Sequence, residues 1–448
     1  MLRKKPLTVF IASVFSGLLP ALVPAVAQAA SFQILEQSPA HLGKAFAGTA
    51  SDIRDASSVF FNPAGIVKLE GSTVTVGANA IFTNAEFNNI NSNTNGIEDK
   101  TDKVGLVPNV YWTLPLSEEA TIGLGVNAPY GLESEYSKDW MGRYLATHSE
   151  LAIASFSGVL AFELNDQWSL GVGLDYQRAE VTLASQVDST FGINPRPATD
   201  SQAKIEGDDD DFVGNASLYF TPNEKLSVGL VFRQGGTFNL EGDARFTLNP
   251  ACSLGAGYPT GAPPAPTTGT LCAVGLNTLA GDAEADVELP DTLTLSASHR
   301  LTDEWQMHAD VALTKWSNIQ TVRVRNASNN LTISELDLQY DDTMRYAVGF
   351  SYEPSGSQWL WRFGVAIDDA PQTDPALVSV RIPDEDRMWF GAGFNYKLSS
   401  TASIDVGYAY IDVQKATIEN TNPQTGSRVS GEFDSNVQIV GVQANWAF

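Results

Sequence analysis

The sequence predicts an all-β protein, a 14-stranded antiparallel transmembrane β-barrel with an N-terminal plug inside its lumen. Three observations predict this fold. Apolar and polar residues alternate along many segments after residue 71. Short polar turns alternate with long irregular loops, and the chain ends on an aromatic residue within an alternating segment. All three are typical of a barrel that crosses a membrane with strands.

Residues 1–29 are predicted to be a secretory signal peptide. Basic residues at positions 3–5 precede an apolar stretch over 7–19, and Ala27-Gln28-Ala29 supplies small residues for cleavage. The alternative, a membrane anchor, is disfavoured because two prolines interrupt the apolar run before the cleavage site. The mature chain is therefore expected to begin at Ala30.

The mature chain is strongly acidic. Cleavage removes three positive charges from a net charge of −25, which leaves −28. Such a chain lacks the basic surface that binds phosphates, so nucleic acid is excluded as a partner. Charge alone leaves an acidic soluble secreted protein open.

Residues 30–70 precede the first predicted strand and are rich in Ala, Gly and Ser. A disordered extension is one interpretation, but Phe46, Phe60 and Phe61 are too apolar for a solvated tail. A 14-stranded barrel is also wider than its own side chains can fill. We therefore predict that this segment is a compact plug, or hatch, in the lumen.

Residues 71–448 are predicted to form the barrel. Within 168–177, for example, Trp168, Leu170, Val172, Leu174 and Tyr176 share one parity and small or polar residues share the other. A soluble sandwich could show the same alternation, but it is not expected to sort its connections by length. Six short turns lie at 115–120, 164–168, 221–226, 301–305, 354–359 and 397–402. Seven long loops lie at 85–104, 132–149, 188–202, 241–284, 325–335, 369–385 and 414–430, which gives 14 strands.

The last strand, "VQIVGVQANWAF", places Val440, Val442 and Trp446 on the parity of the terminal Phe448. A membrane barrel must pair its last strand with its first, because open edges are not tolerated in lipid. A terminal Phe on the lipid-facing parity resembles the assembly signal of outer-membrane barrels. The expected partners are therefore the barrel assembly machinery, outer-membrane lipid and lipopolysaccharide.

The third strand, "TIGLGVNAPYGLESEY", contains a break in its pattern. Clean alternation meets Pro129 and Gly131; proline cannot donate to a ladder and glycine often marks a bulge. The strand either ends at Asn127 or continues through a kink. The predicted plug beside it favours the kink.

Several motifs resemble one family. "ASFQ" at the mature start, "LGKAFAGTA", "DASSVFFNPAG", "VPNVYW", "PYGLESEY", "LPDTLTLSA", "MRYAVGFSY", "IPDEDRMWFGAGFNY" and "ASIDVGYAY" occur in the family's order along nearly the whole mature chain. The chain resembles the FadL family of outer-membrane transporters for long-chain fatty acids and other hydrophobic compounds.

The resemblance implies a monomeric barrel that takes up ligand passively, without a cofactor, and releases it sideways through an opening at the kinked third strand. It also implies that the hatch motif Asn62-Pro63-Ala64 packs beside that kink. The residues predicted to bind or gate the ligand are Phe32, Phe60, Phe61, Asn62, Pro63, Ala64, Pro129, Tyr130 and Gly131.

The ligand class follows less directly. Family fatty-acid transporters meet the carboxylate with basic residues, and those positions align with Leu183 and Asp341 here. An aspartate would repel an anion, so neutral aromatic or aliphatic hydrocarbons are an alternative to long-chain fatty acids. Arg178, Arg233 and Arg345 are candidate lumen contacts that could substitute, although each could instead pair with an acidic neighbour.

Other signals do not predict chemistry. Cys252 and Cys272 are predicted to form a disulfide in the longest loop. "GDDDDF" at 207–212 lacks a metal-site pattern, and we read it as a solvated acidic edge. The scattered histidines and the absence of a nucleophile elbow argue against an enzyme. A structural or receptor-like barrel without transport remains an alternative and would need a fixed plug and an unbroken third strand.

Overall fold

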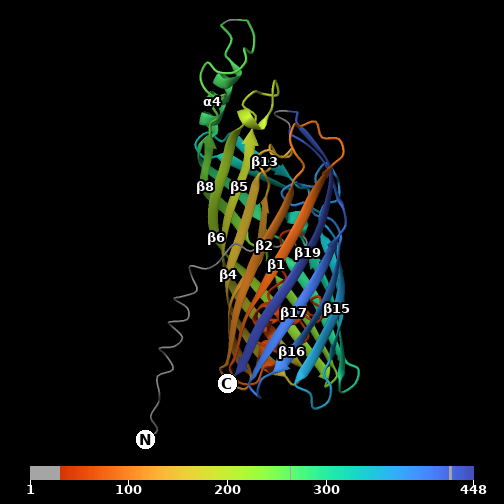
Figure 1. The fold of residues 1–448 in the computed structure, drawn as a ribbon. Helices are drawn as coiled ribbons and strands as arrows, with labels where there is room; N and C mark the ends of the chain where they lie inside the picture. The colour runs from red at the N-terminus through yellow and green to blue at the C-terminus, as the bar shows by residue number, and fades with distance from the viewer. Residues whose placement is uncertain (1–30, 263, 423–425) are drawn as a thin grey trace.

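The computed structural model describes residues 31–448 except residues 263 and 423–425, so the predicted signal peptide lies outside the described residues. A single antiparallel sheet curls into a closed barrel (Figure 1). Its strand segments are β1 (Thr73–Asn89), β2 (Lys100–Pro115), β3 (Ala120–Glu135), β4 (His148–Asn165), β5 (Trp168–Val187), β6 (Ser201–Asn223), β7 (Leu226–Arg233), β8 (Thr237–Thr247), β9 (Gly281–Glu288), β10 (Thr292–Arg300), β11 (Trp305–Thr314), β12 (Thr321–Asn326), β13 (Thr332–Asp337), β14 (Thr343–Tyr352), β15 (Trp359–Asp368), β16 (Arg387–Lys397), β17 (Ala402–Val413), β18 (Ala416–Thr421) and β19 (Arg428–Ala447).

These nineteen segments build fourteen wall strands, because five wall strands each consist of two segments: β7 with β8, β9 with β10, β11 with β12, β13 with β14, and β17 with β18. The first strand pairs along its whole length with the last, from Thr73 opposite Ala447 to Asn89 opposite Gly431. This pairing closes the sheet. The predicted 14-stranded antiparallel barrel is confirmed.

The two ends of the barrel differ as the loop lengths predicted. Short turns and the C-terminus lie at one end, whereas the long loops and α4 (Thr268–Leu279) lie at the other (Figure 1). The strands extend further into the predicted loops than expected, and β8 and β9 take up both ends of the loop predicted at 241–284. Their alternation continues there with charged outward residues such as Glu241 and Glu284. A charged outward face therefore marks where the wall leaves lipid, and not where the strand ends.

The outward face between the two ends is apolar. Exposed side chains such as Phe82, Leu160 and Val442 alternate with buried ones along the strands. Near the short turns the outward face carries aromatic pairs, including Trp168 with Phe220, whose ring centroids are 4.1 Å apart. Aromatic residues gather where a membrane meets water. No helix in the described part of the chain is long and apolar enough to cross a membrane.

Residues 31–72, which we call the inner segment, lie inside the barrel (Figure 1). They contain α2 (Pro39–Leu42), α3 (Ser58–Phe61) and the 3₁₀ helix η1 (Pro63–Lys68). α2 packs against β16, β17 and β19, whereas η1 packs against β4, β5 and β6. Wall glycines make this close approach possible: a Cβ at Gly364 would meet the Lys44 carbonyl oxygen at 2.0 Å.

The disulfide predicted in the longest loop is present between Cys252 and Cys272, 20 residues apart. Both cysteines are buried, and Leu276 of α4 packs with them. We expect the Cys252→Ser substitution to release about 3 kcal/mol of loop constraint without unfolding the barrel, whose strand pairing does not involve this loop. Limited proteolysis with chymotrypsin is expected to cut the variant in residues 249–279. The barrel is expected to keep its heat-modifiable mobility in SDS gels, and loss of that mobility would contradict the prediction.

Candidate ligand cavity and wall opening

The third wall strand leaves its neighbour on one side. β2 and β3 pair only from Pro115 opposite Thr121 to Val110 opposite Val126. Beyond that point β3 continues along β4 to Glu135, with a register shift between Asn127 and Tyr130. The strand therefore does not end at Asn127; it bulges by one residue and parts from β2. Over this stretch the wall has no β2–β3 ladder in the described chain.

The inner segment binds the separated part of β3 from inside. The Ile34 N–H donates to the Pro129 carbonyl (2.8 Å), and the Gly131 N–H donates to the Phe32 carbonyl (2.9 Å). Gln37 satisfies the bulge, because its Nε2 donates to the Ala128 carbonyl at 2.6 Å. Backbone groups that β2 leaves free are thus paired with the first residues of the inner segment.

The motif Asn62-Pro63-Ala64 lies elsewhere. The Asn62 side chain accepts from the Ala64 N–H (3.0 Å) and so caps η1, which has Pro63 in its first turn. The Ala64 N–H also donates to Ser217 Oγ of β6 (2.9 Å). The expectation that this motif packs beside Gly131 is wrong, since its contacts are with the β5–β6 wall. The motif directly follows Phe61 in the sequence, but this position does not indicate which wall strand the motif contacts.

An apolar cavity of about 130 Å³ lies on the inner face of β4, β5, β6, β8, β9, β12 and β13. Phe32 and Leu132 line it, and both also belong to the contact between the inner segment and the parted stretch of β3. Phe32 packs edge-on against Trp316, with ring centroids 4.9 Å apart. Further apolar lining comes from Leu151, Ile153, Val181, Phe238, Leu240 and Leu336. The cavity therefore borders the stretch of β3 that has parted from β2.

Phe60, Phe61 and Tyr130 contribute to this region in different ways. Tyr130 packs in the cluster around Phe32 and donates from its hydroxyl to the Pro290 carbonyl (3.1 Å). Phe61 packs against Phe46 and His41 within the inner segment. Phe60 lies under the Arg233 guanidinium, 4.5 Å from its ring centroid. Of the four aromatic residues predicted to bind or gate the ligand, Phe32 and Tyr130 belong to the cluster beside the cavity, whereas Phe60 and Phe61 do not.

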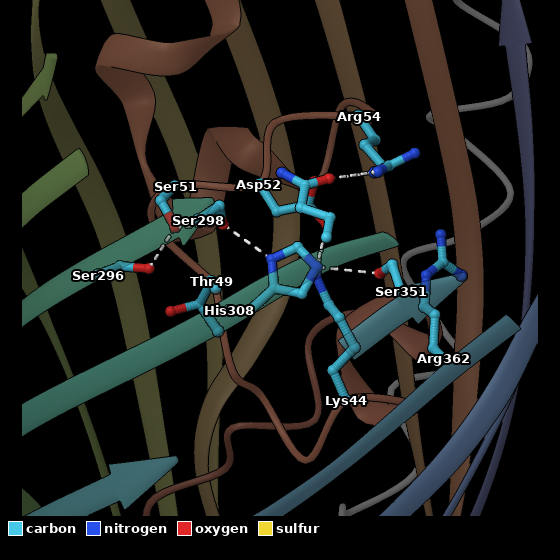
Figure 2. Close-up of polar contacts among 12 residues, drawn as sticks. Lys44, Thr49, Ser51, Asp52, Arg54, Ser296, Ser298, His308, Ser351 and Arg362 are labelled. Atoms are coloured by element: carbon cyan, nitrogen blue, oxygen red, sulfur yellow. Dashed lines mark hydrogen bonds and ion pairs between the residues drawn. The ribbon is translucent and has the colours of Figure 1, made fainter. Parts of the chain in front are cut away.

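Polar contacts fasten the inner segment to the opposite wall (Figure 2). Asp310 of β11 accepts from the Gly48 N–H (2.7 Å), the Thr49 N–H (3.0 Å) and the Thr49 hydroxyl. Ser296 of β10 also donates to Asp310. We call Asp310 with residues 48–49 the latch, because it joins the inner segment to the wall through a buried carboxylate.

His308 of β11 lies beside the latch (Figure 2). Its Nδ1 is 2.8 Å from Ser298 Oγ, and its Nε2 is 2.9 Å from Ser351 Oγ. Asp52 pairs with Lys44 and, at 2.8 Å, with Arg54. Ser298 and His308 are only 1% and 0% exposed. This serine–histidine pair is enclosed between the inner segment and the wall, and Ser298 also contacts Ser51 of the inner segment (2.7 Å).

The family model described as outer membrane protein transport protein (OMPP1/FadL/TodX) matches residues 20–448. The chain belongs to this family. It is an outer-membrane protein whose family members are transport proteins, as the sequence motifs predicted.

Relatives of the FadL-family chain cover nearly its whole length. The long-chain fatty acid transport protein of Escherichia coli O6:H1 is 28% identical over 453 residues, with 96% of each chain covered. The 47 kDa outer membrane protein of Pasteurella multocida is 28% identical over 439 residues, again with 96% of each covered.

Solved structures share the fold. A Pseudomonas aeruginosa FadL homologue has a TM-score of 0.82 at 22% identity, covering 94% of this chain and all of the other. The toluene transporter TbuX of Ralstonia pickettii has a TM-score of 0.64 at 15% identity, covering 92% of this chain and all of the other. Among the described residues of the FadL-family chain, no group of three or more His, Cys, Asp or Glu could hold a metal ion.

The arginines predicted as lumen contacts of this FadL-family barrel do not reach the cavity. Arg178 points outward, where it pairs with Asp208 (2.7 Å) and Glu180. Arg233 is buried but pairs with Asp175 and donates to the Phe60 carbonyl (2.7 Å). Arg345 donates to the Ala45 carbonyl (2.6 Å) and lies over the Trp389 ring. The prediction of Arg178 as a lumen residue is wrong.

The two positions that align with basic residues of family fatty-acid transporters differ in their location. Leu183 lines the cavity, whereas Asp341 is exposed and donates its N–H to the Pro371 carbonyl. The expected repulsion of an anion by Asp341 is therefore wrong, because this carboxylate is not in the cavity.

A basic residue that sequence reasoning missed does border the cavity. Arg381 lies in the loop between β15 and β16 and lines the cavity together with Ile382. Burial lowers the pKa of its guanidinium to about 10, so the side chain is still charged at neutral pH. The sequence does contain a signal that could have pointed to Arg381: the family-like motif "IPDEDRMWFGAGFNY" begins at the next residue, Ile382.

Proposed function

We propose that this outer-membrane transporter takes up hydrophobic compounds passively, with long-chain fatty acids as the first substrate class. In this proposal the ligand enters from the side of the long loops, binds in the apolar cavity and leaves through the wall between β2 and β3. The inner segment acts as the hatch that prevents free diffusion through the lumen. No cofactor is needed, because metabolic consumption inside the cell maintains the gradient.

The observation that carries the proposal is that the cavity borders the stretch of β3 that has parted from β2. Phe32 and Leu132 line the cavity and also belong to the contact that covers the parted stretch of β3. A small displacement of the first residues of the inner segment would therefore connect the cavity with the wall between β2 and β3. A barrel with a purely structural or receptor role would have no need for a strand that leaves its neighbour beside an apolar cavity.

Physical chemistry favours a sideways exit. A route through a water-filled lumen would expose the alkyl chain to water at a cost of about 0.8 kcal/mol per CH₂. Release through the wall keeps the chain in apolar surroundings from the cavity to the membrane. Apolar side chains of β2 beside the opening, such as Val104 and Leu106, face outward at 62% and 42% exposure and continue this surface.

Neutral hydrocarbons are the second candidate substrate class. The cavity lining is predominantly apolar, and Leu183 stands where family fatty-acid transporters have a basic residue. Toluene and alkanes would need no charged partner. The same route would serve them.

An uptake assay distinguishes these substrates. Cells that lack their own transporter of this family would express this protein, and entry of labelled oleate and labelled toluene would be measured against an empty vector. We expect oleate uptake well above the vector level and a smaller gain for toluene. No gain for either compound would contradict the proposed function. The proposal also includes insertion as a monomer by the barrel assembly machinery, with lipopolysaccharide around the loop end.

A further inference from the structure

Arg381 reaches the cavity wall from a distant loop. Its Nη1 donates to the His148 carbonyl (3.1 Å) and to Ser149 Oγ (2.8 Å) at the start of β4, and its Nη2 donates to the Leu145 carbonyl (2.7 Å). Ser149 is directly opposite Leu183 in the β4–β5 ladder. The guanidinium therefore lies beside Leu183, the wall position that aligns with a basic residue in family fatty-acid transporters.

The charge of Arg381 has a different environment from that of four other buried arginines. Arg143, Arg233, Arg362 and Arg387 each form an ion pair with an aspartate. Arg381 is only 8% exposed, yet its hydrogen bonds in the described chain go to two carbonyls and one hydroxyl. A buried charge without a counter-ion is costly, so this site favours an anion.

The geometry leaves donors for such an anion. A guanidinium carries five N–H groups, and three hydrogen bonds to described residues use three of them. Among the described residues, no hydrogen bond or ion pair joins Arg381 to an acid that lines the cavity, and Glu150, the residue after Ser149, lies 3.4 Å from His148 Nε2 instead. Arginine is well suited to carboxylates because its planar donors match their two oxygens.

We infer that Arg381 binds the carboxylate of a long-chain fatty acid whose alkyl chain lies in the apolar cavity. This inference rests on the proposed function and makes its substrate class specific. The carboxylate lies beside Ser149 and Leu183, and the alkyl chain extends over the apolar lining toward Phe32. Selection for the carboxylate thus comes from a loop residue that replaces a wall residue.

Binding measurements with two ligands of equal chain length test this inference. Purified protein in lipid nanodiscs would be titrated with oleate and with oleyl alcohol, which has the same chain and no charge. In Arg381→Gln we expect oleate affinity to fall about tenfold or more, as for loss of a charge-assisted hydrogen bond. Affinity for oleyl alcohol is expected to stay close to wild type. Arg381→Lys is expected to recover part of the preference for oleate.

Arg178→Gln is the matched control, because that arginine lies on the outer face and its loss removes the same charge. It is expected to change neither affinity. Equal losses for oleate and oleyl alcohol in Arg381→Gln would overturn the inference in favour of a structural role for the loop, and unchanged oleate binding would overturn it outright. In both cases the proposed function would stand if wild type binds either ligand. If wild type binds neither, the proposed function itself fails.

Discussion

Deletion of Pro129 is expected to abolish uptake while the barrel still assembles. The bulge holds one extra residue between Asn127, opposite Ser155, and Tyr130, opposite Ile153. Removing that residue gives β3 a continuous register on β4 with the same partners for Tyr130 and the residues after it. β3 can then continue its ladder with β2 beyond Val110, and the wall opening closes.

The measurement is oleate uptake by cells expressing the deletion variant, with surface-exposed protein and heat-modifiable mobility as evidence of assembly. Uptake is expected to fall to the vector level. The control is a one-residue deletion at Gly255, which lies in the longest loop, where an added Cβ would meet nothing within 4 Å. Normal uptake by an assembled Pro129 deletion would refute lateral release, and the cavity would then need another exit.

Asp310→Ala is expected to loosen the inner segment and open the lumen. The substitution leaves two backbone N–H groups, of Gly48 and Thr49, and two hydroxyls without their buried acceptor. Each unsatisfied buried group costs about 1–3 kcal/mol. The wall ladders are unaffected, so the loss falls on docking of the inner segment.

Conductance in planar bilayers and sensitivity to large polar antibiotics measure this effect. The variant is expected to show open-channel steps and increased sensitivity, whereas wild type does not. Asp434→Ala is the matched control, because that carboxylate is 59% exposed and pairs with Lys415 on the outer face at 3.5 Å. A closed, wild-type-like Asp310→Ala barrel would mean that packing at α2 and η1 holds the segment without the latch.

Much of the fold could be predicted because its signals are local. Alternation between the two faces of a strand, turn length and the disruptive effect of Pro129 act over a few neighbouring residues. The strand number, the closure by β19 and the bulge in β3 followed from these patterns. The predicted loop boundaries are too wide, because β8 and β9 carry charged outward residues although the alternation of their side chains continues.

The outward position of Arg178 is already contained in the strand alternation. Arg178 has the same parity as Trp168 and Leu174, which face outward, so the alternation already assigned it to the outer face. Arg233 shares its inward parity with the buried Val231 and does lie inside. Parity is thus a stronger guide to lumen residues than the presence of a charge.

The sequence by itself determined the barrel, its orientation of short turns and long loops, the family and the position of the break in the third strand. Only the tertiary structure decided which inner residues cover that break, since Phe32, Ile34 and Gln37 meet β3 whereas Asn62 meets β6. It also decided that Arg381 reaches Ser149, 232 residues away in the chain. Strand patterns arise from neighbouring residues, but contacts across a lumen depend on how distant segments pack together, and no local pattern records that.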